Sequence, residues 1–137
     1  MIVLDSSFLI AFHNDRDVHH PAARAIMPRL IQGEWGPALL PEYVFVEVTT
    51  VIALKRDLLN AAQVGSVLLN AREVEFVPCS SLFQEAWRFF RTQGGDSILS
   101  FVDSAIATLA RQHGAQYLAT FDSGFRKVSG LTLVPAL

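Results

Sequence analysis

Four acidic residues of this sequence stand next to or within apolar segments, where burial of an unpaired carboxylate costs free energy. Two follow short, largely apolar runs, at 2–4 and 117–120, and two lie within apolar segments that read VFVEV and SFVDSA. They are Asp5, Glu47, Asp103 and Asp122. Because an unpaired buried carboxylate is strongly disfavoured, acids in such surroundings are candidates for a catalytic or metal-binding site.

Four carboxylates that converge on one place repel one another and raise each other's pKa. A hard divalent cation such as Mg²⁺ or Mn²⁺ removes this repulsion, because it prefers oxygen ligands. Such an ion lowers the pKa of a bound water and stabilises attack on a phosphodiester. The chemistry that these residues predict is therefore metal-dependent hydrolysis of a phosphate ester, most naturally in a nucleic-acid backbone.

Each acid also has an ordinary structural interpretation. Asp5 could cap the helix that follows it, and Glu47 could pair with Lys or Arg of a neighbouring helix. Asp103 could lie near a helix N-terminus, where the helix dipole favours negative charge, and Asp122 could open a turn. Taken singly, these interpretations have the advantage. Taken together, two acids after strands and two on apolar helices favour a shared site.

The elements expected from the pattern of apolar residues alternate between strand and helix. Strands are expected at 2–4, 35–40, 74–77, 117–120 and 131–134. Helices are expected at 6–13, 18–32, 42–56, 60–72, 82–92 and 98–113. This order predicts an α/β fold with a central, mostly parallel, twisted sheet of about five short strands and helices on both faces. Ligands of such sheets bind beyond the carboxyl ends of the strands, where Asp5 and Asp122 would lie.

Several helix ends can be predicted from local residue types. The segment 42–56 is rich in β-branched residues, but its length and its terminal Lys55-Arg56 favour helix. The pairs Asn60/Gln63 and Ser81/Gln84 have the spacing of capping boxes. Gly114 is expected to end the last long helix.

Composition indicates a compact protein of one domain, residues 1–137. Hydrophobic residues make up 51% of the chain, and Cys79, the one cysteine, excludes an internal disulfide and is expected to pack in the core. No apolar run is long enough for a membrane span, and the N-terminus has no secretory signal pattern. We therefore expect a cytoplasmic protein.

The charge balance gives no direct support to nucleic-acid binding. The net charge is −2, with 11 basic and 13 acidic residues, whereas nucleic-acid-binding proteins usually carry a basic patch. If four acids belong to a metal site, nine remain against the 11 basic residues, which leaves +2 outside the site. A nucleic-acid substrate is therefore compatible with the sequence.

The histidines do not form a recognisable metal motif. His19 and His20 are adjacent in a polar segment, so they cannot share the i,i+4 geometry of a helical metal site.

The acids and their flanking residues resemble the PIN-domain family, and in particular the VapC-type toxins of prokaryotic toxin–antitoxin pairs. The resemblance runs nearly from end to end and rests on the order and spacing of the motifs. These are VLDSS at 3–7, PEYVFVEV at 41–48, LSFVDSA at 99–105, YLATFDSGF at 117–125, Gly130 and the terminal Val134-Pro135. No single motif is specific, but the ordered set in a chain of this length is.

The resemblance implies a Mg²⁺- or Mn²⁺-dependent endoribonuclease with a PIN-like doubly wound sheet. Asp5, Glu47, Asp103 and Asp122 would be the catalytic, metal-binding acids. Thr120 and Ser6 or Ser7 would be hydroxyls around that cluster. Asp96 would be either the cap of the following helix, which we favour, or a further acid outside the cluster.

The resemblance also implies partners: an RNA substrate, a small antitoxin protein that covers the crevice, and a second copy of the chain in a homodimer. The alternatives are a PIN nuclease of RNA processing that is not a toxin, and a catalytically inert PIN-like interaction module. The complete set of four acids weighs against the inert module. A haloacid-dehalogenase-like phosphatase would need an Asp at position 7, where Ser7 stands. A phospho-acceptor receiver domain would need an acidic neighbour beside Asp5, which is also missing.

Overall fold

Short runs of apolar residues form the five strands of one parallel sheet. The computed structural model describes residues 1–137. Its strands are β1 (Ile2–Leu4), β2 (Ala38–Pro41), β3 (Val74–Val77), β4 (Tyr117–Ala119) and β5 (Thr132–Val134). They are ordered β3-β2-β1-β4-β5, and every neighbouring pair is parallel. The strand β1 is therefore central, and its three residues are buried because helices cover the sheet on both sides.

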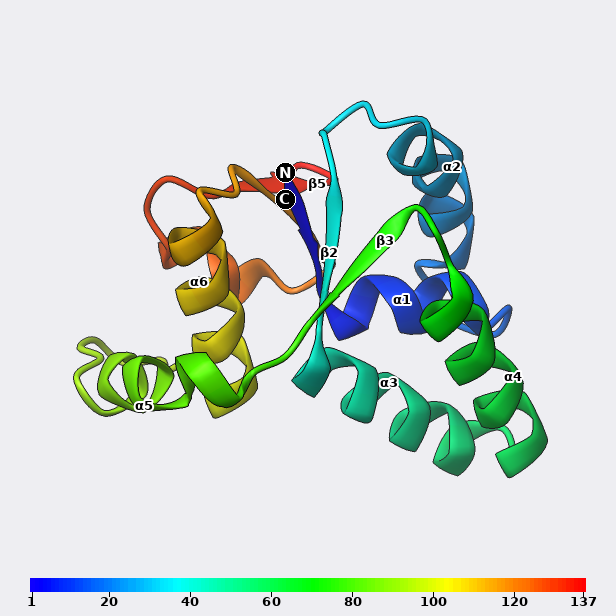
Figure 1. Ribbon diagram of the computed structural model, residues 1–137, viewed down its shortest axis with the longest axis horizontal. Coiled ribbons are helices and arrows are strands. Elements are labelled where there is room, and N and C mark those ends of the chain that lie inside the picture. Colours follow the sequence, from blue (N-terminus) through cyan, green and yellow to red (C-terminus); the bar gives the residue numbers. More distant parts are fainter.

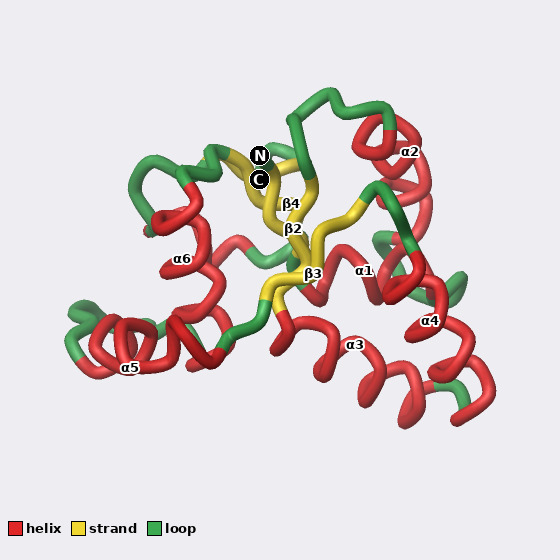
Figure 2. The backbone as a smooth tube through the Cα atoms, in the orientation of Figure 1, coloured by secondary structure: helices red, strands yellow, loops and turns green.

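Six α-helices connect these strands. They are α1 (Ser6–His13), α2 (His20–Ile31), α3 (Glu42–Lys55), α4 (Leu58–Asn70), α5 (Phe83–Arg91) and α6 (Phe101–His113). Two 3₁₀ turns, η1 (Ser80–Leu82) and η2 (Ser123–Lys127), follow β3 and β4. Helices α1 to α4 lie on one side of the sheet and α5 and α6 on the other (Figure 1), while the strands converge between these two layers (Figure 2). The predicted α/β class with a parallel sheet is confirmed. None of the helices combines the length and the apolarity that crossing a membrane requires.

The expected cap of α4 was wrong. The helix begins two residues earlier than predicted, and Asp57, not Asn60, is its N-cap. The Asp57 carboxylate accepts hydrogen bonds from the backbone nitrogen of Asn60 at 2.7 Å and from its side-chain amide at 2.8 Å. An ionised carboxylate is the better acceptor for the unpaired N–H groups of a first turn, so it defines the start.

The starts of α5 and α6 also differ from the prediction. The residues of the Ser81/Gln84 pair form no capping box, because η1 occupies 80–82 and α5 begins at Phe83 without a side-chain cap. Helix α6 begins at Phe101 instead of residue 98, and Ser100 caps it by accepting a hydrogen bond from the Asp103 nitrogen at 3.1 Å. This shift moves Asp103 from the middle of a helix to its first turn.

Smaller differences occur at strand ends. The strand β2 begins at Ala38 and includes Pro41, whereas residues 35–40 were expected. Gly36 has φ of +80° and lies against the backbone of Met1, so the chain turns there before it enters the sheet. Cys79 is fully buried in the core, as expected.

We expect Gly114→Ala to destabilise the protein by about 1 kcal/mol, because Gly114 ends α6 with φ of +65° and a Cβ disfavours this left-handed conformation. Gly94→Ala is the matched control, since Gly94 has no positive φ and an added Cβ would meet nothing within 4 Å at either glycine. Urea unfolding of both variants measures the difference. Equal stability of the two variants would contradict the assigned cap.

Candidate active site

The carboxyl edge of the two central strands carries the first group of candidate residues. Leu4 of β1 is paired with Ala119 of β4, and the Asp5 nitrogen donates to the Ala119 carbonyl at 3.0 Å. The chain continues from Ala119 through Thr120 to Asp122, so both strands deliver acids to the same edge. The prediction that Asp5 and Asp122 lie beyond the carboxyl ends of strands is thereby confirmed.

Asp5 is held by hydroxyl groups and not by a positive charge. The residue is 3% exposed. Its Oδ2 accepts hydrogen bonds from Ser7 Oγ at 2.8 Å and Thr120 Oγ1 at 2.6 Å. Although Asp5 occupies the N-cap position of α1, its side chain makes no capping hydrogen bond. The interpretation of Asp5 as a simple helix cap is therefore wrong.

The same hydroxyls organise the segment that follows β4. The Phe121 nitrogen donates to Ser7 Oγ at 2.9 Å, and the Asp122 nitrogen donates to Thr120 Oγ1 at 3.0 Å. Ser7 and Thr120 thus tie the orientation of Asp5 to the path of residues 120–122. The structure thus places the hydroxyls of Ser7 and Thr120 within hydrogen-bond distance of Asp5, and their part in a catalytic site stays a prediction.

Glu47 approaches Asp5 from helix α3. The Ser6 hydroxyl donates to Glu47 Oε1 and lies 3.4 Å from Asp5 Oδ1. Because one hydroxyl lies between two carboxylates, Ser6 links the first acid to the second. The ordinary interpretation of Glu47 as half of an ion pair does not hold, because the three salt bridges of the structure include none of the four acids.

Asp103 faces Asp5 and Asp122 from the first turn of α6. Burial, together with the negative charges of Asp5 and Asp122, raises the pKa of Asp103 to about 6 against the opposing hydrogen bonds of Ser100. The expected position near a helix N-terminus is correct, but the helix dipole does not offset the loss of water and the nearby carboxylates.

Burial also raises the pKa of Asp5. The hydrogen bonds from Thr120 and Ser7 act in the opposite direction, and the charge of Glu47 adds to the increase. The ionised Asp5 carboxylate is therefore stabilised by the dipoles of the Ser7 and Thr120 hydroxyls, and it forms no ion pair with Lys or Arg.

Asp122 and Asp96 lie nearer the solvent. Asp122 is exposed, and its Oδ1 accepts a hydrogen bond from the Gly124 nitrogen at 2.8 Å, so it also opens a turn. Asp96 is exposed in the loop before α6. Since Ser100 caps that helix, the expectation that Asp96 is the cap was wrong. Ser100 was not predicted as a cap, although Ser100 and Asp103 have the spacing of a cap and its third helical residue.

The donor set fits a hard cation in chemistry but is not a ready-made coordination sphere. No three His, Cys, Asp or Glu side chains are grouped closely enough to hold a metal ion. Mg²⁺ is usually held by one or two carboxylates together with waters and substrate phosphates. The pairs Asp5/Glu47 and Asp103/Asp122 supply carboxylates of that kind without competing Lys or Arg. Metal binding by the four acids remains a prediction.

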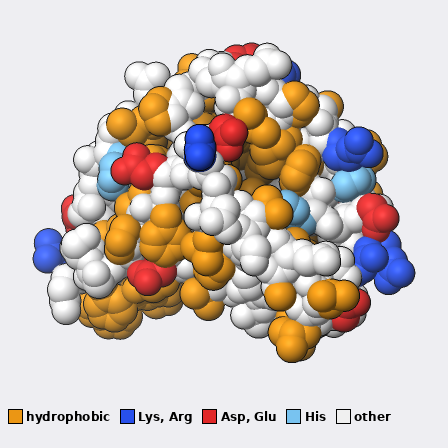
Figure 3. Space-filling model, turned by 45° about the vertical axis from the view of Figure 1, so that its right-hand side comes forward, with side chains coloured by type: hydrophobic (Ala, Val, Ile, Leu, Met, Phe, Trp, Pro, Cys, Tyr) orange, Lys and Arg blue, Asp and Glu red, His pale blue; other side chains and the backbone are white.

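An apolar groove of about 560 Å³ opens beside Glu47. Its hydrophobic lining comes from α3, α5 and α6, namely Tyr43, Val46, Val51, Phe83, Phe101 and Val102. Val46 is 56% and Phe83 45% exposed. In the view of Figure 3, hydrophobic side chains form several patches, with a few acidic groups beside them. The candidate site is therefore bordered by surface suited to an apolar partner.

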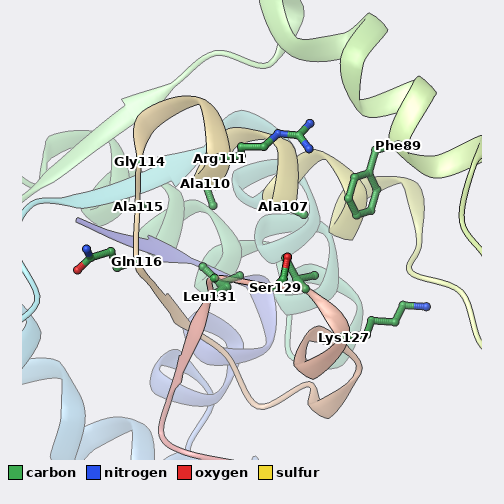
Figure 4. A pocket seen from close by; sticks show the side chains of 12 residues that line it. Phe89, Ala107, Ala110, Arg111, Gly114, Ala115, Gln116, Lys127, Ser129 and Leu131 are labelled. Atoms are coloured by element: carbon green, nitrogen blue, oxygen red, sulfur yellow. The ribbon is translucent and has the colours of Figure 1, made fainter.

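A second cavity, of about 430 Å³, lies away from the four acids, between the end of α6 and the segment before β5 (Figure 4). Arg111 and Lys127 line it. Both are already engaged, Arg111 with Glu85 at 3.1 Å and Lys127 with the Ser97 carbonyl. This cavity contributes nothing to the acidic edge.

Comparisons with known proteins agree with this architecture. The sequence model of the PIN domain matches residues 2–131. A VapC ribonuclease of Archaeoglobus fulgidus is 23% identical over 126 residues, which cover 90% of this chain and 78% of that protein. The crystal structure of Mycobacterium tuberculosis VapC20, a toxin that cleaves the sarcin–ricin loop, matches with a TM-score of 0.82 at 21% identity, over 94% of this chain and 95% of that one. A toxin–antitoxin complex from Klebsiella pneumoniae matches with a TM-score of 0.65 at 15% identity over the whole of both chains. At these identities the structural matches establish the fold.

We expect Asp103→Asn to raise the melting temperature of the metal-free protein at pH 7.5 by roughly 3 °C. The pKa of Asp103 is raised from 3.8 to about 6 in the folded state, so the folded protein loses stability as the pH rises between these values and the group ionises. The asparagine has no such loss. The gain in melting temperature of Asp103→Asn over wild type should therefore be full above pH 6 and absent at pH 4.

Thermal unfolding in a chelator at both pH values measures this difference. Asp96→Asn is the matched control, because Asp96 is exposed and its substitution should leave the melting temperature unchanged. An Asp103→Asn variant that melts below wild type at pH 7.5 would contradict the electrostatic account of the site.

Proposed function

The chain belongs to the PIN domain family, and from this premise we propose that it is a Mg²⁺- or Mn²⁺-dependent endoribonuclease, the toxin of a type II toxin–antitoxin pair. One observation carries the proposal. Asp5 and Glu47 share the Ser6 hydroxyl, the charges of Asp5 and Asp122 act on Asp103, and no Lys or Arg forms an ion pair with any of the four acids. A cation that prefers oxygen ligands would neutralise the charge of these carboxylates.

RNA is the substrate that the relatives support. The curated relative is named a ribonuclease, and VapC20 is described as cleaving the sarcin–ricin loop. The net charge of −2 limits long-range attraction to a polyanion. A metal held at the acids would supply the positive charge that the phosphodiester needs, and would provide a bound water of lowered pKa as nucleophile.

The protein's own residues have separate tasks in this proposal. Asp5 and Glu47, joined through Ser6, are the inner carboxylate pair, and Asp103 and Asp122 are the outer pair. Ser7 and Thr120 hold Asp5 Oδ2 with two hydrogen bonds, so the carboxylate does not need to reorient when charge develops nearby. Burial of Asp5 excludes water that would otherwise screen the site.

An antitoxin is the protein partner that we propose, and the groove beside Glu47 supports it. Structural neighbours include a toxin–antitoxin complex, and the groove offers apolar surface next to unpaired carboxylates. A small antitoxin that fills it would cover the crevice and prevent access of RNA. We also propose that the chain forms a homodimer, as the VapC-like sequence pattern implies, and that it acts in the cytoplasm, which its single cysteine favours.

Asp5→Asn is expected to lower RNA cleavage at least about 100-fold, because it removes the most buried carboxylate and with it several kcal/mol of metal-dependent stabilisation. Purified protein is incubated with total RNA in Mg²⁺ or Mn²⁺, with and without chelator. Glu42→Gln is the matched control on the same edge, since Glu42 accepts only the Cys79 nitrogen at 3.0 Å and should leave cleavage intact. Equal cleavage by wild type and Asp5→Asn would sink the assignment.

Metal binding is expected independently of cleavage. Saturating Mn²⁺ should raise the melting temperature of wild type by roughly 5 °C, because a ligand of the folded state stabilises it by mass action. The increase should be absent in Asp5→Asn and in Glu47→Gln, and retained in Glu42→Gln. An identical increase in melting temperature for wild type and the three variants would show that the ion binds away from Asp5 and Glu47.

A further inference from the structure

An exposed histidine lies stacked on an aromatic ring beside the candidate active site. The rings of His19 and Phe121 are parallel within 4°, with their centroids 4.4 Å apart. Phe121 stacks in turn on Phe8, with centroids 6.1 Å apart and planes inclined by 22°. Phe8 is fully buried, Phe121 is half-buried and His19 is exposed. The three residues form a column of rings, Phe8–Phe121–His19, that leads from the core to the solvent.

This ring column is fixed to the acids through hydrogen bonds. The Phe121 nitrogen donates to Ser7 Oγ at 2.9 Å, and Ser7 Oγ donates to Asp5 Oδ2 at 2.8 Å. Phe121 also stands between Thr120, which holds Asp5, and Asp122. A group bound at the outer end of the column would therefore keep a constant position relative to two of the four acids.

The outer face of the His19 ring is the accessible part of the column. One face of the imidazole lies against Phe121, and no other aromatic ring stacks on it. His19 is exposed to solvent, and Phe121 is the aromatic ring against which its imidazole lies. Flat side chains that are backed by a rigid ring, and open on one face, are the surfaces on which unpaired bases of RNA stack.

We propose that the outer face of His19 is a stacking site for an unpaired base of the RNA strand, next to the phosphodiester held at the acids. The inference rests on the proposed function and narrows its substrate class. A base inside a duplex has both faces covered by its neighbours, so this site accepts a single strand or a loop from which one base can be turned out.

Binding of two strands of equal length and charge tests this site. One is a fluorescein-labelled oligoadenylate, and the other is an abasic ribose-phosphate strand. Both are titrated with the Glu47→Gln variant, which is expected to prevent cleavage and whose altered side chain is hydrogen-bonded to Ser6 and not to Ser7, Thr120 or Phe121. His19→Ala in this background should weaken binding of oligoadenylate roughly tenfold and leave binding of the abasic strand unchanged, because only the former loses a stacking partner.

Two further variants separate stacking from other effects. His19→Trp keeps an aromatic face and should retain the binding of oligoadenylate. Val18→Ala is the matched control, because Val18 is the adjacent residue and is 85% exposed; it should bind both strands as the parent does. Equal loss for both strands in His19→Ala, or no loss for either, would overturn the stacking site.

The outcome for this site is distinguishable from that for the proposed function. Cleavage of RNA by wild type without base-dependent binding at His19 would keep the nuclease and remove the stacking site. Base-dependent binding that His19→Ala abolishes, in a protein that cleaves no RNA with Mg²⁺ or Mn²⁺, would support the stacking site and overturn the nuclease.

Discussion

The desolvation of Asp5 is the constraint on which the rest of the site depends. The residue follows the central strand and is 3% exposed, and burial of a carboxylate without a counter-ion is strongly unfavourable. The dipoles of neighbouring hydroxyl groups offset part of this free-energy cost. Ser7 and Thr120 donate to the carboxylate, and both hydroxyls also bind the backbone of residues 121 and 122. The two hydroxyls that stabilise the buried Asp5 therefore also fix the backbone that leads to Asp122.

The other acids bring further negative charge to this edge, so they do not offset the free-energy cost of burying Asp5. Glu47 shares the Ser6 hydroxyl with Asp5, and the charges of Asp5 and Asp122 act on the half-buried Asp103. The three ion pairs lie elsewhere on the surface, and the more exposed of them contribute little to stability. Like charges that lie close together at one edge lower the stability of the free protein. Such an arrangement is characteristic of a functional site.

Both layers of the fold contribute to this edge. Asp5 and Asp122 arrive on the strands β1 and β4, Glu47 on α3 from one layer and Asp103 on α6 from the other. The ring column joins the same edge to the core through Phe8 and to the solvent through His19. The acids proposed to act on a phosphodiester and the ring proposed to stack on a base are thus linked by one hydroxyl network around Asp5.

The sequence by itself determined the order of strands and helices, the parallel sheet and the four acids as candidates, because apolar periodicity and buried acids are local signals. It did not determine helix starts. Asp57 and Ser100 were missed as caps in favour of Asn60 and Asp96, since several polar residues near each start have suitable side chains and only backbone geometry chooses among them. It could not reveal the Ser6 link between Asp5 and Glu47, which are 42 positions apart, or the stacking of His19 on Phe121. Those contacts depend on the crossing of elements that are distant in sequence, and only the tertiary structure brings them together.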